Sequence, residues 1–327
     1  MIQRFLSLLC CSILYTAVYA GGTETLLQGR DSSYIGVVER PWSFRLYGVT
    51  KVLELNLRSV EDSIPSARYN PREKLGIGVG TFYRSFGLWA GMQLGNKPNE
   101  RQAFRLDLQL NQFGKKFTND YYFQFYRGLF LENQDVFQRF IQTSTNNYRE
   151  DISVVGFGMN SYYYFNWKRF SMRAVYIQSE QQKKAAGSLL AGGSLSNFAF
   201  QADSSVLPLN QTDFAGEGIR AGNSLLLAGN IGYTYSWVWN EHAYANVTVI
   251  SGAGISSWSY SIIDGPDNQV IRPLWRIAGR ASIGYNSKRF FYGINAIMDQ
   301  STILYGQRNV SYSMGNIRFF VGYRPGF

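Results

Sequence analysis

The sequence predicts an all-β chain that forms one transmembrane, antiparallel, up-and-down β-barrel of about 12 strands, preceded by a signal peptide. Segments in which apolar and polar side chains alternate recur along the chain, and the connections between them are alternately short and long. Aromatic residues make up 16% of the 327 residues and charged residues only 17%, whereas soluble globular chains carry about 25% charged residues. A barrel that meets lipid outside and water inside needs this mixture.

The first 20 residues are typical of a cleaved secretory signal peptide. Arg4 supplies the positive charge, residues 5–18 form an apolar run too short to span a bilayer, and residues 18–20 resemble a cleavage site. Acylation of Cys10 or Cys11 is the alternative, and Leu9 disfavours it because a small residue is needed there. We therefore expect export to the bacterial outer membrane and a mature chain without disulfides.

The chain then divides into a signal peptide (1–20), an N-terminal periplasmic segment (21–50) and the barrel (51–327). Strands are expected near residues 51–58, 75–83, 87–94, 103–113, 119–130, 152–166, 169–179, 221–237, 243–257, 272–286, 289–299 and 310–327.

The C-terminal segment shows the alternation most clearly. Ile317, Phe319, Val321 and Tyr323 share one face of the expected strand, and mostly polar or small residues share the other. Tyr323 and the terminal Phe327 resemble the signal that outer-membrane barrels present to their assembly machinery, which we expect to be a partner during biogenesis.

The connection lengths support the same fold independently. Short connections follow the even-numbered strands, and longer ones follow the odd-numbered strands, at about 59–74, 95–102, 131–151, 180–220, 258–271 and 300–309. Short periplasmic turns and longer extracellular loops are expected of a barrel with both termini in the periplasm. The turns at 166–170 and 286–290 share basic and aromatic residues, which suit either contact with lipid headgroups or docking of a periplasmic partner.

Charged side chains on the water-facing sides of the strands are the candidate lumen residues. They are Glu54, Arg58, Arg105, Asp107, Arg173, Arg276, Arg280 and Arg318. Because arginines outnumber acids, a narrow channel for small, even anionic, solutes is one interpretation. The other is an internal network of paired charges that plugs the barrel, so that its role is structural or partner-binding.

Catalytic chemistry finds little support in the sequence. His242 is the single histidine, and it lies in an expected periplasmic turn, whereas nucleophilic catalysis on serine needs a base beside the nucleophile. We therefore expect no enzyme, with an outer-membrane lipid-modifying enzyme as the alternative. We also expect no metal or cofactor, no nucleic-acid partner because the basic residues are scattered, and a monomer surrounded by outer-membrane lipid.

Two segments resemble a family of Bacteroidota proteins that is catalogued as a domain of unknown function and taken to be outer-membrane barrels. The first segment is Phe165-Asn-Trp-Lys-Arg-Phe-Ser-Met-Arg-Ala174 followed by residues 182–188, and the second is Gly232-Tyr-Thr-Tyr235. Members of the family often carry serine where this chain has Ala185. The resemblance implies a location and a phylum, and it brings no activity, substrate or catalytic residue.

Overall fold

The structure is a computed structural model that describes residues 29–59, 66–71, 75–93, 104–133, 147–206, 218–263, 267–305 and 308–326. Its elements are β1 (Ile35–Val37), β2 (Trp42–Ser59), β3 (Ala67–Asn70), β4 (Leu75–Tyr83), β5 (Phe86–Gln93), β6 (Phe104–Phe113), β7 (Phe117–Leu131), β8 (Tyr148–Tyr164), the π-helix η1 (Arg173–Ile177), β9 (Glu180–Gln182), β10 (Ala186–Gln201), β11 (Ile219–Trp239), β12 (Ala243–Ile262), β13 (Asp267–Asn286), β14 (Phe290–Tyr305) and β15 (Arg308–Tyr323).

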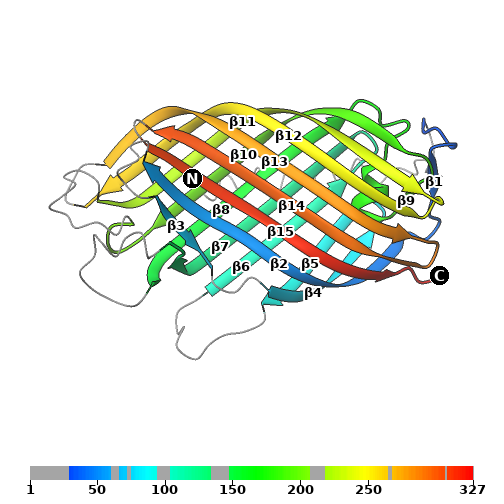
Figure 1. The fold of residues 1–327 in the computed structure, drawn as a ribbon, viewed down its shortest axis with the longest axis horizontal. Helices are drawn as coiled ribbons and strands as arrows, with labels where there is room; N and C mark the ends of the chain where they lie inside the picture. Colours follow the sequence, from blue (N-terminus) through cyan, green and yellow to red (C-terminus); the bar gives the residue numbers. More distant parts are fainter. Residues whose placement is uncertain are drawn as a thin grey trace.

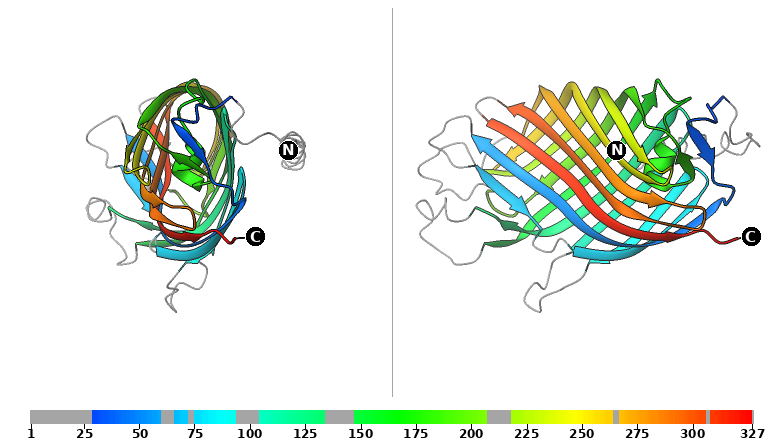
Figure 2. Two further views of the ribbon diagram at one scale, coloured as in Figure 1. Left: turned by 90° about the vertical axis from the view of Figure 1, so that its right-hand side faces the viewer. Right: turned by 45° about the vertical axis from the view of Figure 1, so that its right-hand side comes forward.

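Twelve of the thirteen strands in the main sheet close an antiparallel ring (Figures 1 and 2). The ring runs β2–β4–β5–β6–β7–β8–β10–β11–β12–β13–β14–β15, and β15 pairs with β2 from Tyr323↔Phe44 to Arg308↔Ser59. The thirteenth strand is β3, which lies between β2 and β7. The expected all-β barrel of about 12 strands is confirmed.

The two ends of the barrel differ, and we name them by their connections. The turn end carries the turns at Arg84–Ser85 and Asn240–His242, and the loop end is the opposite end. An apolar belt surrounds the turn-end part of the wall, where outward side chains such as Leu46 are up to 70% exposed. Aromatic residues border this belt at the turn end: Trp42, Phe44, Tyr83, Phe117, Phe165, Trp237, Trp239, Phe290, Tyr292 and Tyr323.

The polarity of the two faces inverts along β2. Near the turn end Phe44 and Leu46 point outward and Arg45 points inward, but beyond Lys51 the inward residues are leucines. Glu54 and Arg58 lie on the outward face there, because Leu53, Leu55 and Leu57 between them are buried in the interior. The prediction that Glu54 and Arg58 line the lumen is therefore wrong.

The inversion follows from strand length. Strands β11, β12 and β13 contain 21, 20 and 20 residues, whereas about 9–11 residues suffice to cross a bilayer. The loop-end part of the wall extends beyond the apolar belt, so its outer face is polar and its inner face can form an apolar core.

A glycine bulge guides β7 toward β3. The pairing of β7 with β8 shifts register between Arg127 and Leu129, and Gly128 between them has a φ of +81°. This positive φ favours glycine. Beyond the bulge Leu131 pairs with Tyr69 of β3, so β3 connects β2 directly to β7 at the loop end.

Three expectations about strand positions are corrected. Residues 169–179 do not form a wall strand, because they fold into the lumen and contain η1. The wall strand at this place in the ring is β10, within the expected loop 180–220. β2 begins at Trp42, inside the segment 21–50 that we expected to precede the barrel.

Candidate functional site

The lumen at the loop end is filled by an apolar cluster. We call it the loop-end cluster; its buried members are Leu53, Leu55, Leu57, Ala67, Tyr69, Tyr126, Leu129, Leu131, Ile152, Val154, Phe198, Phe200, Ala202, Val206, Ile219, Leu226, Trp258, Leu274, Ile303, Val310 and Tyr312. The rings of Phe198 on β10 and Tyr312 on β15 stack across the lumen with centroids 4.0 Å apart. This contact joins strands that are five places apart in the ring.

The lumen at the turn end is filled by the plug, which we define as residues 165–185 between β8 and β10. Figure 2 (left) shows η1 lying inside the ring. Phe170, Met172, Val175, Tyr176 and Ile177 of the plug are buried. They pack against inward side chains of the wall, which together with them form the turn-end cluster: Tyr47, Val49, Phe82, Trp89, Phe113, Tyr162, Tyr164, Ala186, Leu190, Tyr244, Ile250, Ala278, Phe291 and Phe320.

Arg45 of β2 holds the plug through its backbone. Its guanidinium donates hydrogen bonds to the carbonyl oxygens of Tyr176, at 2.9 Å, and Ile177. The same group lies 4.1 Å from the ring centroid of Phe82 and 4.8 Å from that of Phe291. Aromatic faces attract a desolvated cation, and they stabilise this charge, which is only 3% exposed.

Ion pairs and hydrogen bonds anchor the outer part of the plug. Glu180 forms salt bridges with Arg30, at 3.1 Å, and with Arg173, at 3.3 Å. Burial lowers the pKa of Arg30, and the Glu180 carboxylate opposes that shift. Arg324, directly after β15, donates to the carbonyl oxygen of Gln178, and burial lowers its pKa to about 10. Arg173 therefore belongs to the plug and not to a wall strand.

A polar layer separates the two apolar clusters. Arg276 of β13 is ion-paired with Asp299 of β14 and donates hydrogen bonds of 2.9 Å to the hydroxyl of Tyr162 and the side-chain oxygen of Asn230. Arg280 of β13 is ion-paired across the lumen with Asp120 of β7. These arginines are buried and paired, as charges within a barrel must be.

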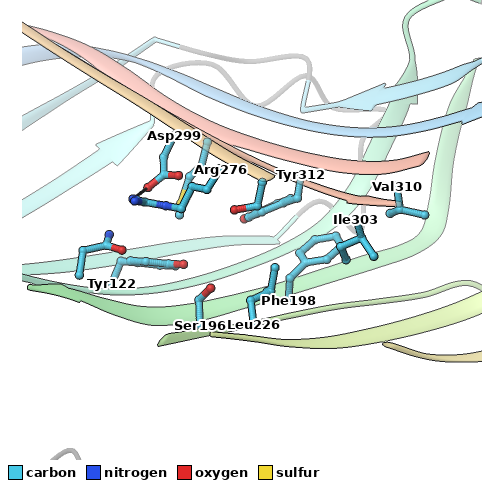
Figure 3. A pocket seen from close by; sticks show the side chains of 12 residues that line it. Tyr122, Ser196, Phe198, Leu226, Arg276, Asp299, Ile303, Val310 and Tyr312 are labelled. Carbon is cyan, nitrogen blue, oxygen red and sulfur yellow. Dashed lines mark hydrogen bonds and ion pairs between the residues drawn. The ribbon is translucent and has the colours of Figure 1, made fainter. Parts of the chain in front are cut away.

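A small cavity lies beside the polar layer on its loop-end side. Figure 3 shows Arg276 and Asp299 at one end of this cavity, and Phe198 and Tyr312 beside it. Its volume is about 20 Å³, enough for roughly one water molecule. The cavity is too small to form a passage.

Asp107 of β6 is the centre of a second part of the polar layer. Its carboxylate accepts an ion pair from Lys51 of β2 at 2.8 Å, and hydrogen bonds from Gln124 at 3.1 Å and from Tyr126 at 3.3 Å. Nearby, Arg318 of β15 donates to Gln109 and lies 4.6 Å from the ring centroid of Trp89. Arg105 lies on the same inward face of β6.

A larger cavity, which we call the side pocket, lies beside these charges. Its volume is about 430 Å³, within the range of roughly 300–1,000 Å³ that is usual for ligand pockets. It is lined by Tyr47, Val49, Lys51, Gly76, Trp89, Ala90, Gly91, Met92, Phe104, Arg105, Leu106, Asp107, Leu108, Gln109, Tyr126 and Arg318. The sequence predicted Arg105, Asp107 and Arg318 as lumen residues, and all three line this pocket.

The remaining predicted residues fall outside these sites. Tyr323 ends β15 with its ring outward, 5.2 Å from that of Phe290, and Phe327 lies outside the described residues. The Nδ1 atom of His242 is 3.3 Å from the side-chain nitrogen of Gln181. Within the described ranges, His242 has no hydrogen-bonded carboxylate or hydroxyl, no group of three or more His, Cys, Asp or Glu could hold a metal, and no helix is long and apolar enough to cross a membrane.

Comparison with solved structures gives distant matches. The outer-membrane protease OmpT from Escherichia coli is 9% identical, with a TM-score of 0.38 over 88% of this chain and 97% of that chain. The toluene transporter TodX from Pseudomonas putida is 9% identical, with a TM-score of 0.26 over 89% of this chain and 93% of that chain. A search of curated proteins found no match.

A family model matches residues 29–324, which cover all of the described strands and the plug. The assignment of this family to Bacteroidota stays a prediction. The chain belongs to the family described as "Domain of unknown function (DUF4421)".

Proposed function

We propose that this chain is an outer-membrane barrel whose lumen is closed to hydrated solutes, and that its role is structural and partner-binding. The apolar belt with its aromatic border supports the membrane location. With both termini in the periplasm, the turn end is periplasmic and the loop end projects from the cell.

One observation carries the closed lumen: side chains meet across it at successive levels. Phe198 stacks on Tyr312 in the loop-end cluster, Arg280 pairs with Asp120 farther down, and Arg45 binds the plug nearest the turn end. A hydrated ion would have to displace all three contacts, so the interpretation of the lumen as a narrow channel is the weaker of the two.

Conductance of the purified barrel in a planar bilayer tests this proposal. We expect no conductance above that of the bare lipid, and a general porin serves as the positive control. Replacing residues 171–178 of the plug by a Gly-Ser linker should also leave the barrel non-conducting, because the loop-end cluster fills the lumen independently. Discrete ion-selective channels in the unmodified protein would refute the closed lumen.

The basic surface at the turn end supports a second candidate function, docking of an anionic periplasmic partner. Lys168, Arg169 and Lys184 are exposed on the plug, and Lys288 and Arg289 are exposed on the neighbouring turn. Peptidoglycan carries carboxylates and is the test partner. Co-sedimentation with it should fall when Lys168 and Lys184 are both changed to Glu, and unchanged co-sedimentation would eliminate this candidate.

The proposal assigns no catalytic step to the barrel. It further holds that outer-membrane lipid surrounds a monomer and that Tyr323 and Phe327 contribute to recognition by the assembly machinery. Deletion of Phe327 should then slow membrane insertion, measured by the appearance of the heat-modifiable folded form, without changing the stability of the assembled barrel.

A further inference from the structure

Among the described residues, β5 and β6 are paired over only part of their length, and the wall of the barrel has a gap between them. These strands pair over only four residue pairs, from Phe86↔Gln112 to Trp89↔Gln109. Residues 90–93 of β5 and 104–108 of β6 are described, but no pairing joins them to each other. Unpaired sheet edges that face hydrocarbon are strongly unfavourable. The gap therefore favours an occupant with one part that packs against lipid and another part that binds the polar groups of the wall.

The side pocket passes through this gap. Its outer lining includes Ala90, Met92, Leu106 and Leu108, which point outward from the wall and are exposed. Its inner lining includes the charged groups described above. One cavity of about 430 Å³ therefore connects the lipid-facing surface with the polar layer.

The pocket lies at the border of the apolar belt. The outward face of β2 is apolar at Leu46 and polar at Glu54. Lys51 lies between these two residues along the strand, at the level where the outer face changes. Lipid headgroups gather where the outer face of a membrane barrel changes from apolar to polar. A headgroup at this level can reach Lys51 through the gap while its acyl chains remain beside the belt.

The charge of the pocket favours an anion. Three cations, Lys51, Arg105 and Arg318, and one carboxylate, Asp107, line it, so the lining has a net charge of +2. Arg318 is 6% exposed, its hydrogen-bond partner Gln109 is neutral, and among the described residues its Nε has no hydrogen-bond partner. A buried cation in such surroundings is stabilised by an anionic oxygen.

We propose that the side pocket binds one anionic lipid of the surrounding membrane. The anionic headgroup lies against Arg318 and Lys51, and an acyl chain leaves between β5 and β6 into the bilayer. This site goes beyond the proposed closed lumen. If no lipid binds, the expected absence of conductance is unaffected. If the barrel conducts ions, the expected binding of lipid at the side pocket is unaffected.

Quenching of tryptophan fluorescence tests the site, because Trp89 is the one tryptophan that lines the pocket. The mature barrel is placed in phosphatidylcholine nanodiscs that contain a small, equal fraction of either brominated phosphatidylglycerol or brominated phosphatidylcholine. We expect the anionic lipid to quench more strongly. This excess, the additional quenching by phosphatidylglycerol over that by phosphatidylcholine, should disappear in Trp89→Phe. The Arg318→Gln variant should require about tenfold more anionic lipid to reach the same excess.

Two further variants guard against misfolding and indirect effects. Ala90→Phe changes an outward, exposed residue at the mouth and should abolish the excess by filling the gap, whereas Arg220→Gln at the exposed start of β11 should leave it intact. Folding of each variant is checked by heat-modifiable mobility. Equal quenching by the two lipids in the unmodified barrel would overturn the proposal. The proposal would also be overturned if the excess persisted in both Arg318→Gln and Ala90→Phe. The same holds if millimolar inorganic phosphate alone removed the excess.

Discussion

The Arg45 guanidinium donates a 2.9 Å hydrogen bond to the carbonyl oxygen of Tyr176, and thereby joins the first wall strand to the plug. Arg45→Gln should leave the carbonyls of Tyr176 and Ile177 without their donor, and each unsatisfied buried group costs about 1–3 kcal/mol. We expect a loss of about 2–4 kcal/mol in the free energy of unfolding, measured by denaturant titration in detergent micelles. Arg84→Gln, at an exposed turn, is the matched control and should change stability little.

The inversion of faces along β2 predicts opposite behaviour for two adjacent residues. In the chain without residues 1–20, which contain both cysteines, Glu54→Cys should react with a membrane-impermeant maleimide. Leu55→Cys should react only after unfolding, because Leu55 is 0% exposed. Leu55→Ala should cost about 2–5 kcal/mol, and Glu54→Ala less than about 0.5 kcal/mol. Rapid labelling of Leu55→Cys in the folded barrel would contradict the assignment.

The ion pair between Arg276 and Asp299 predicts a strongly non-additive double-mutant cycle. Arg276→Met leaves a buried carboxylate without its counter-ion and should cost about 3–5 kcal/mol, whereas replacing both partners by apolar residues is often nearly neutral. We therefore expect Arg276→Met/Asp299→Leu to recover most of the loss, measured from unfolding midpoints in urea. Additive losses would mean that the two side chains do not interact.

The bulge in β7 predicts a specific effect of adding one methyl group. Gly128→Ala should be destabilising by about 1–2 kcal/mol, because an L-residue is strained at its positive φ. The new Cβ would also clash with the hydroxyl oxygen of Tyr148. Gly229→Ala is the control, since a Cβ there has no heavy atom within 4 Å. Equal unfolding midpoints for the two variants would contradict a requirement for glycine in the bulge.

The sequence predicts the barrel well where one face meets lipid and the other meets the polar layer. Arg276, Arg280 and Arg318 lie inward in the structure because their strands alternate with outward residues such as Ile277 and Phe319. Period-two alternation separates the two faces of a strand, but it does not say which face is inside. Glu54 and Arg58 were misplaced for this reason, since the interior beside them is apolar.

The plug and β10 are harder to predict, because neither has the sequence pattern that is typical of its own structure. Phe170, Met172, Ala174 and Tyr176 alternate as a strand would, yet they are buried inside the ring. β10 is rich in glycine, serine and alanine, so its alternation is weak. The gap between β5 and β6 depends on where two strands separate, which no pattern within either strand determines.

The latches of the plug come from both sides of the seam at which the ring closes. Arg45 belongs to β2 and Arg324 directly follows β15, the two strands that meet last when the chain is followed from end to end. Closure of the ring therefore also completes the contacts that hold the plug. A barrel without its final strand would lack the seam with β2 and also the contact of Arg324 with the carbonyl oxygen of Gln178.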